Sequence, residues 1–114
     1  MKAIALSLLL VFAMLASDAY AGSYQGQITH VFAYVGKVYI DVQDGGFDNP
    51  TTCTGSSDHL ALWVDPSTDF GKALVSISLT AKSTGRVVWV SGNNTCITGP
   101  LGASEQMLAI DFKG

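Results

Sequence analysis

The two cysteines and the two histidines are the residues of this 114-residue chain with the most reactive side chains. Cys53 and Cys96 could form a disulfide, or one of them could be a thiolate nucleophile with His30 or His59 as its base. A nucleophile needs a free thiolate, whereas a cysteine pair in an exported chain is ordinarily oxidised. We therefore expect a Cys53–Cys96 disulfide, and we expect the histidines to be exposed or hydrogen-bonded strand residues.

Carboxylates offer the next possible chemistry, either as metal ligands or as acid and base groups. Asp41, Asp44 and Asp48 lie around a Gly-Gly turn with Asn49, and calcium binds to several oxygens of this kind. Their spacing does not match an EF-hand loop, so we interpret them as solvated loop residues. Glu105 is the only glutamate, and no aspartate spacing singles out the carboxylate pair of a glycosidase. We expect neither a metal site nor a cofactor.

The sequence contains none of the common catalytic motifs. It lacks the G-x-S-x-G, H-E-x-x-H and G-x-x-x-x-G-K patterns, and it has no zinc-type spacing of cysteine and histidine. We therefore expect a protein that is not an enzyme. The formal net charge of −3 and the pI near 4.9 also disfavour nucleic-acid binding, because such binding requires basic side chains that neutralise phosphates.

Aromatic side chains are the remaining candidates for ligand contact. Sugar-binding sites stack apolar sugar faces on aromatic rings and hydrogen-bond the hydroxyls through Asn, Gln, Ser and Asp side chains. Strand aromatics are more often core residues, and we expect Trp63 and Trp89 to pack in the core because their neighbours are apolar. The aromatic residues considered are Tyr24, Tyr34, Tyr39, Phe47, Trp63 and Trp89.

The N-terminal segment predicts export from the cytosol. A short basic start precedes an apolar run from Ala3 to Ala16, and Ala19-Tyr20-Ala21 has the small-x-small form of a signal-peptidase site. The run is shorter than the roughly 20 residues that span a bilayer, although an uncleaved anchor is the alternative. We therefore expect residues 1–21 to be a bacterial Sec signal peptide. Residues 22–114 then form one secreted or periplasmic domain without membrane insertion.

Five segments of the mature chain have the composition of β-strands. β-branched and aromatic residues dominate them, and segments rich in Gly, Asp, Asn, Ser and Thr predict loops at 44–58 and 91–104. A turn at Gly36-Lys37 joins the first two strands as a hairpin. The predicted strands are 24–35, 38–42, 59–64, 86–90 and 105–112.

One segment, between the third and fourth strands, predicts a helix. Candidate N-caps lie in residues 65–69, and Gly85 is well placed as the C-terminal cap. Apolar residues then recur with helical spacing and predict a buried face. That face consists of Phe70, Ala73, Leu74, Ile77 and Ala81. Val75 and Leu79 lie off this stripe, which favours a second covered side of the helix, for example by another subunit.

The predicted element order is three strands, one helix and two strands. Short turns between sequential strands favour antiparallel pairing, and five short strands can close into a small barrel. This is the element order of an OB-fold. We therefore predict a mainly β, OB-fold-like domain with one helix, with a small α+β sandwich as the alternative.

Three local features of the mature chain carry a resemblance to a known family. Tyr24-Gln25-Gly26 opens the first strand, a long helix runs from Phe70 to Gly85, and Ser83-Thr84-Gly85-Arg86-Val87-Val88 leads from that helix into the next strand. These features resemble the binding (B) subunits of the subtilase-cytotoxin and typhoid-toxin family. In that family the first strand starts with aromatic-Ser-Gly, and the helix runs into a Thr-Gly-x-x-Val-x strand.

The resemblance implies an OB-fold protein that assembles as a homo-pentamer, binds host-cell glycans and has no catalytic activity of its own. It implies Tyr24 and Gln25 as ligand-binding residues. Gln25 stands where the family has the sugar-contacting Ser, and its amide can also hydrogen-bond hydroxyls. An exported A-subunit-like protein is the implied partner.

Our hypothesis from the sequence is a secreted, non-catalytic binding protein for a glycan or another small polar ligand. The alternative is a secreted interaction protein or inhibitor that docks a larger exported partner.

Overall fold

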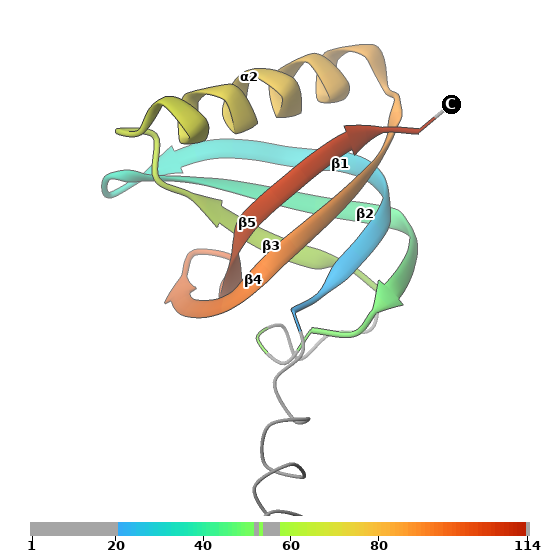
Figure 1. Ribbon diagram of the computed structural model, residues 1–114, viewed down its shortest axis with the longest axis horizontal. Coiled ribbons are helices and arrows are strands. Elements are labelled where there is room, and N and C mark those ends of the chain that lie inside the picture. Colours follow the sequence, from blue (N-terminus) through green and yellow to red (C-terminus); the bar gives the residue numbers. More distant parts are fainter. Residues whose placement is uncertain (1–20, 52, 54–57, 114) are drawn as a thin grey trace, which may run out of the picture.

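A computed structural model describes residues 21–51, 53 and 58–113 (Figure 1). All of the predicted leader at residues 1–21 except Ala21 therefore lies outside the described part. The elements follow one another in the predicted order of three strands, one helix and two strands. They are β1 (Ser23–Tyr34), β2 (Lys37–Asn49), β3 (Leu60–Val64), α2 (Asp69–Thr84), β4 (Val87–Gly99) and β5 (Gly102–Phe112).

The five strands form a closed barrel in the order β1-β2-β3-β5-β4, and β4 pairs back with β1. All neighbours are antiparallel except β3 and β5, which are parallel and pair through Leu62↔Glu105 and Trp63↔Gln106. The helix α2 connects β3 to β4 and lies across one end of the ring of strands (Figure 1). The OB-fold-like prediction of a mainly β domain with one helix is confirmed.

The core consists of apolar side chains that point into the barrel. β3 reads Leu-Ala-Leu-Trp-Val and is buried along its whole length, because it is covered on both faces. Trp63, in this strand, is buried as predicted, whereas Trp89 in β4 is only half-buried. The residues with no exposed surface include Ile40, Val42, Leu60, Leu62, Val88 and Val90.

Both segments predicted as loops belong in large part to strands. β2 continues to Asn49, and the predicted loop at 91–104 is instead the end of β4 and the start of β5. These strands accommodate turn-forming residues at β-bulges, where the register shifts. Asp44 and Asn94 lie at such shifts and have positive φ angles of 60° and 65°. The strand partners supply the backbone hydrogen bonds that a loop would leave to water.

The turn between β1 and β2 lies at Val35-Gly36, one residue earlier than predicted. Both residues have positive φ angles, 45° and 77°, which match the right-handed twist of a two-residue hairpin. Glycine adopts such angles without steric cost, whereas Val35 is β-branched and 81% exposed at this tip.

The helix begins and ends as predicted, and its buried face is confirmed only in part. Leu74 and Ala81 are buried as predicted, and Ile77 is half-buried. Thr68 is the N-cap and accepts a hydrogen bond from the Gly71 amide, and Gly85 caps the C-terminus with a φ of 66°. Phe70 and Ala73 were expected in the core, yet both are exposed. The helix packs so closely at Gly71 that a Cβ there would clash with the carbonyl oxygen of Asp65. The buried residues of the helix are Gly71, Leu74, Ser78 and Ala81.

Candidate functional site

Tyr24, one of the two residues implied by the family resemblance, is a core residue with no exposed surface. Its hydroxyl donates a hydrogen bond to the carbonyl oxygen of Asp58 at 2.9 Å and accepts one from the Gly45 amide at 3.0 Å. Its ring meets Phe47 edge-on, with centroids 4.9 Å apart. Tyr24 therefore holds β1 against β2 and the segment before β3, and it presents no surface to a ligand in this conformation.

Gln25, the other implied residue, is exposed beside a shallow depression. On its two sides Gln25 pairs with Gly46 of β2 and Trp89 of β4. The depression has a volume of about 380 Å³ and combines polar side chains with the half-buried ring of Phe47. Its lining residues are Gln25, Gly26, Asp44, Gly45, Gly46, Phe47, Asp48 and Val87.

The depression exists because the backbones of β1 and β2 approach closely at a bulge. The register shifts between Gln25 and Gln27, and a Cβ on Gly45 would clash with the carbonyl oxygen of Gln25. Asp44 turns through a positive φ angle at the same place. Asp44 and Asp48 are exposed, as expected of solvated residues, whereas the same expectation is wrong for Asp41, which is buried in β2. No sequence signal links Asp44 and Asp48 with Gln25, because strand pairing alone brings them together.

Both histidines, His30 in β1 and His59 just before β3, lie beside one buried carboxylate. Asp41 is 4% exposed; its Oδ1 lies 2.8 Å from Nδ1 of His59, and its Oδ2 accepts a hydrogen bond from Nε2 of Gln43 at 2.6 Å. His30 is more distant, with Nδ1 3.9 Å from Oδ2, and its side chain is 62% exposed. The expectation of exposed or hydrogen-bonded histidines is confirmed. The contacts with His59 and Gln43 offset the desolvation of the Asp41 carboxylate.

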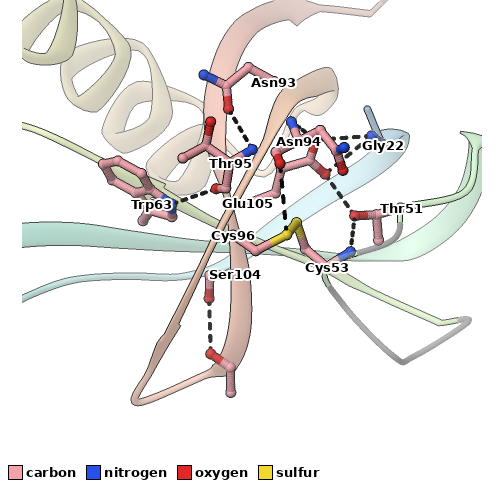
Figure 2. The surroundings of a disulfide bond; sticks show 11 residues. Gly22, Thr51, Cys53, Trp63, Asn93, Asn94, Thr95, Cys96, Ser104 and Glu105 are labelled. Atoms are coloured by element: carbon pink, nitrogen blue, oxygen red, sulfur yellow. Dashed lines mark hydrogen bonds between the residues drawn. A yellow bond between two sulfur atoms is a disulfide. The ribbon is translucent and has the colours of Figure 1, made fainter. Parts of the chain in front are cut away.

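The predicted disulfide between Cys53 and Cys96 is present, with the two Cα atoms 5.4 Å apart (Figure 2). Neither cysteine is free, so neither offers the thiolate that a nucleophile requires. The bridge joins the segment after β2 to β4 and indicates a non-reducing compartment.

A second feature of this region, which was not predicted from the sequence, is the fully buried carboxylate of Glu105. It accepts hydrogen bonds from the Gly22 amide at 3.1 Å to each oxygen, from the Thr51 hydroxyl at 2.7 Å and from the Asn94 amide at 2.6 Å (Figure 2). A glutamate at the start of a short strand is ordinarily exposed, so the sequence alone gives little reason to expect this burial. The cluster ties the first residues of the barrel to β4 and β5.

A second hollow, of about 240 Å³, lies between the start of α2 and β5. Phe70 and Leu108 line it and are 58% and 52% exposed, respectively. Asn93 and Gln106 add a polar side, where the Asn93 amide nitrogen donates to the Gln106 amide oxygen at 2.8 Å. This surface joins two exposed apolar side chains to a hydrogen-bonded amide pair.

Within the described ranges, no group of three or more histidine, cysteine, aspartate or glutamate side chains is arranged to hold a metal ion. In the same part of the chain, no helix has the length and apolar character needed to cross a membrane. Comparisons with protein families, with curated proteins and with solved structures give no match for this chain.

Proposed function

We propose that this chain is an exported, non-catalytic binding protein of the toxin B-subunit kind that recognises a glycan or another small polar ligand through the Gln25 depression. The grouping of one amide, two carboxylates and one half-buried ring around this depression carries the proposal. Amides and carboxylates hydrogen-bond sugar hydroxyls, and an apolar sugar face packs on an aromatic ring. Tyr24 contributes to this site indirectly: it is buried beneath the depression, and its edge-on contact positions the ring of Phe47.

Export and secretion are also part of this proposal. The disulfide is consistent with an oxidising compartment, and the predicted signal peptide directs the chain there. A shallow surface site suits an extended polar ligand such as an oligosaccharide, because part of the ligand stays in water.

A glycan array probed with the oxidised protein tests the proposal, followed by titration of the best-binding glycan. We expect Gln25→Ala to weaken this binding by about tenfold or more, because the amide is at the edge of the depression. Gln27→Ala is the matched control, since Gln27 is exposed on the same strand but outside the depression. Equal affinities of the Gln25→Ala variant and the unmodified protein would remove this site assignment. A protein that binds no glycan on the array would overturn the glycan proposal.

The apolar surface around Phe70 and Leu108 favours a second candidate function, an interaction protein or inhibitor that docks a larger exported partner. Two exposed large apolar residues at the edge of one hollow are typical of a protein contact. Light scattering after size exclusion separates the two candidates. A mass of five chains supports the proposal that the protein forms a ring like that of the toxin B subunits. A monomer overturns the ring and favours the docking function, which a Phe70→Ser, Leu108→Ser double variant would then abolish.

A further inference from the structure

The residue after the predicted signal-peptidase site is buried directly before β1. Gly22 is buried, while the preceding Ala21 is exposed. The Gly22 nitrogen lies 3.1 Å from both carboxylate oxygens of Glu105, and its carbonyl oxygen accepts a hydrogen bond from the Gly92 amide at 2.9 Å. The peptide bond between Ala21 and Gly22 therefore joins an exposed residue to one held at both its nitrogen and its oxygen.

Glu105 lacks a positively charged group among the contacts described for its carboxylate. The donors to this carboxylate are the Gly22 and Asn94 amides and the Thr51 hydroxyl, and all of them are neutral while residue 21 is attached. Burial of an ionised carboxylate is costly unless an opposite charge accompanies it. In the uncut chain, the neutral amide nitrogen of Gly22 thus occupies the position beside Glu105 where a positive charge would stabilise the carboxylate most.

We propose that removal of the leader after Ala21 creates a buried ion pair between the new α-ammonium group of Gly22 and the Glu105 carboxylate. The export peptidase breaks the bond between the Ala21 carbonyl carbon and the Gly22 nitrogen with one water molecule. The products are the Ala21 carboxylate and the Gly22 ammonium group, so atoms and charge balance. This inference rests on the export part of the proposed function, but it does not depend on any ligand.

The geometry requires glycine at position 22. A Cβ there would lie 2.6 Å from the Thr51 Cβ and 3.0 Å from Glu105 Oε2. A side chain there would therefore require residue 22 or Thr51 to shift, and both of these residues donate hydrogen bonds to Glu105. A chain that begins one residue earlier, at Ala21, would place its charged amine at an exposed position and leave a neutral amide on Glu105. The site thus discriminates between N-termini that differ by one residue.

A double-mutant cycle tests the ion pair. Four oxidised chains are compared by urea unfolding at pH 6.5: chains that begin at Gly22 or at Ala21, each with Glu105 or with Glu105→Gln. Every strand and the helix lie within both chains. Glu105→Gln should raise the unfolding equilibrium constant in both chains. We expect the rise to be larger by about tenfold or more in the Gly22 chain than in the Ala21 chain, because an ammonium group gains more from the carboxylate than an amide does. Equal effects in the two chains would overturn the proposal.

The accessibility of the amine gives a second readout if Glu105→Gln prevents folding. At neutral pH an acylating reagent should label the N-terminus of the folded Gly22 chain about tenfold more slowly than that of the folded Ala21 chain, because the first amine is buried and protonated. Mass spectrometry of the N-terminal peptide measures the two rates. Equal labelling would contradict the buried pair. N-terminal sequencing of the exported protein tests the processing step separately, and a start other than Gly22 would overturn that step.

Discussion

The side chain of Glu105 fills the space in which a Cβ of Gly92 would have to lie. The position therefore requires glycine for reasons of space, because any larger residue would displace a buried carboxylate from its donors. We expect Gly92→Ala to lower the free energy of unfolding by about 3 kcal/mol, the upper part of the usual range for overpacking. Urea denaturation of the oxidised protein measures this change.

Gly46→Ala is the matched control for that substitution. A Cβ at Gly46 would meet nothing within 4 Å, and the residue is exposed in β2. We expect this control to change the free energy of unfolding by less than about 1 kcal/mol. If Gly92→Ala lowered the free energy of unfolding as little as this control does, Glu105 would be able to move aside without cost.

Reduction of the Cys53–Cys96 bridge should destabilise the barrel strongly. The two residues are 43 positions apart, and closing a loop of that length stabilises the folded state by about 4 kcal/mol in the chain-entropy description. We expect a reductant to lower the urea midpoint accordingly. A Cys53→Ser, Cys96→Ser double variant serves as the control, because its midpoint should match that of the reduced protein and should not respond to reductant. Coincident unfolding curves for the oxidised and reduced proteins would contradict this expectation.

His59 and His30 should differ in their contributions to stability. His59→Ala removes the partner 2.8 Å from the buried Asp41 carboxylate, and we expect a loss of about 2 kcal/mol in the free energy of unfolding. His30→Ala removes an exposed side chain 3.9 Å from the same carboxylate, and its expected effect is below about 0.5 kcal/mol. Thermal and urea unfolding of the two variants check this order, and an equal or reversed order would refute it.

The carboxyl group of Asp65, just before α2, should titrate below its ordinary range. The hydroxyl and then the amide of Ser67 donate hydrogen bonds to it and lower its pKa from 3.8, and Lys37 adds a weaker attraction. The ionised carboxylate therefore contributes stability above the unfolded-state pKa, and this contribution disappears as the pH falls through the folded-state pKa. We expect Ser67→Ala to raise the pKa of Asp65 in an NMR titration. Lys37→Ala should raise it less, and no change in the Ser67→Ala variant would contradict the assignment.

The element order could be predicted because it depends on local composition. The run from Leu60 to Val64 and the caps of α2 are encoded in neighbouring residues, and the structure agrees with both. The disulfide followed from the cysteine count together with the leader. In contrast, the helix face depends on what covers it. Gly71 lets the helix approach the preceding segment, and this rotates Phe70 out to solvent.

The extent of the long strands could not be predicted because pairing decides it. Asp44 and Asn94 favour turns, yet register shifts place them within paired strands. The Glu105 cluster shows the same limit, since its donors Gly22, Thr51 and Asn94 are far apart in the sequence. Of the two implied site residues, only Gln25 is exposed, because the inward-facing positions of β1 place Tyr24 in the core.

The Cys53–Cys96 bridge turns the middle of the chain into a covalent ring that contains β3 and α2. A single backbone cut inside this ring leaves one molecule, because both cut ends remain attached through the sulfur bridge. β1 and β2 before the ring and β5 after it keep their connection to it. A protein built in this way can be nicked once by a protease near the exposed Gly85 turn without losing any fragment. Its separation into two pieces then depends on the redox state of the surroundings and not on the protease.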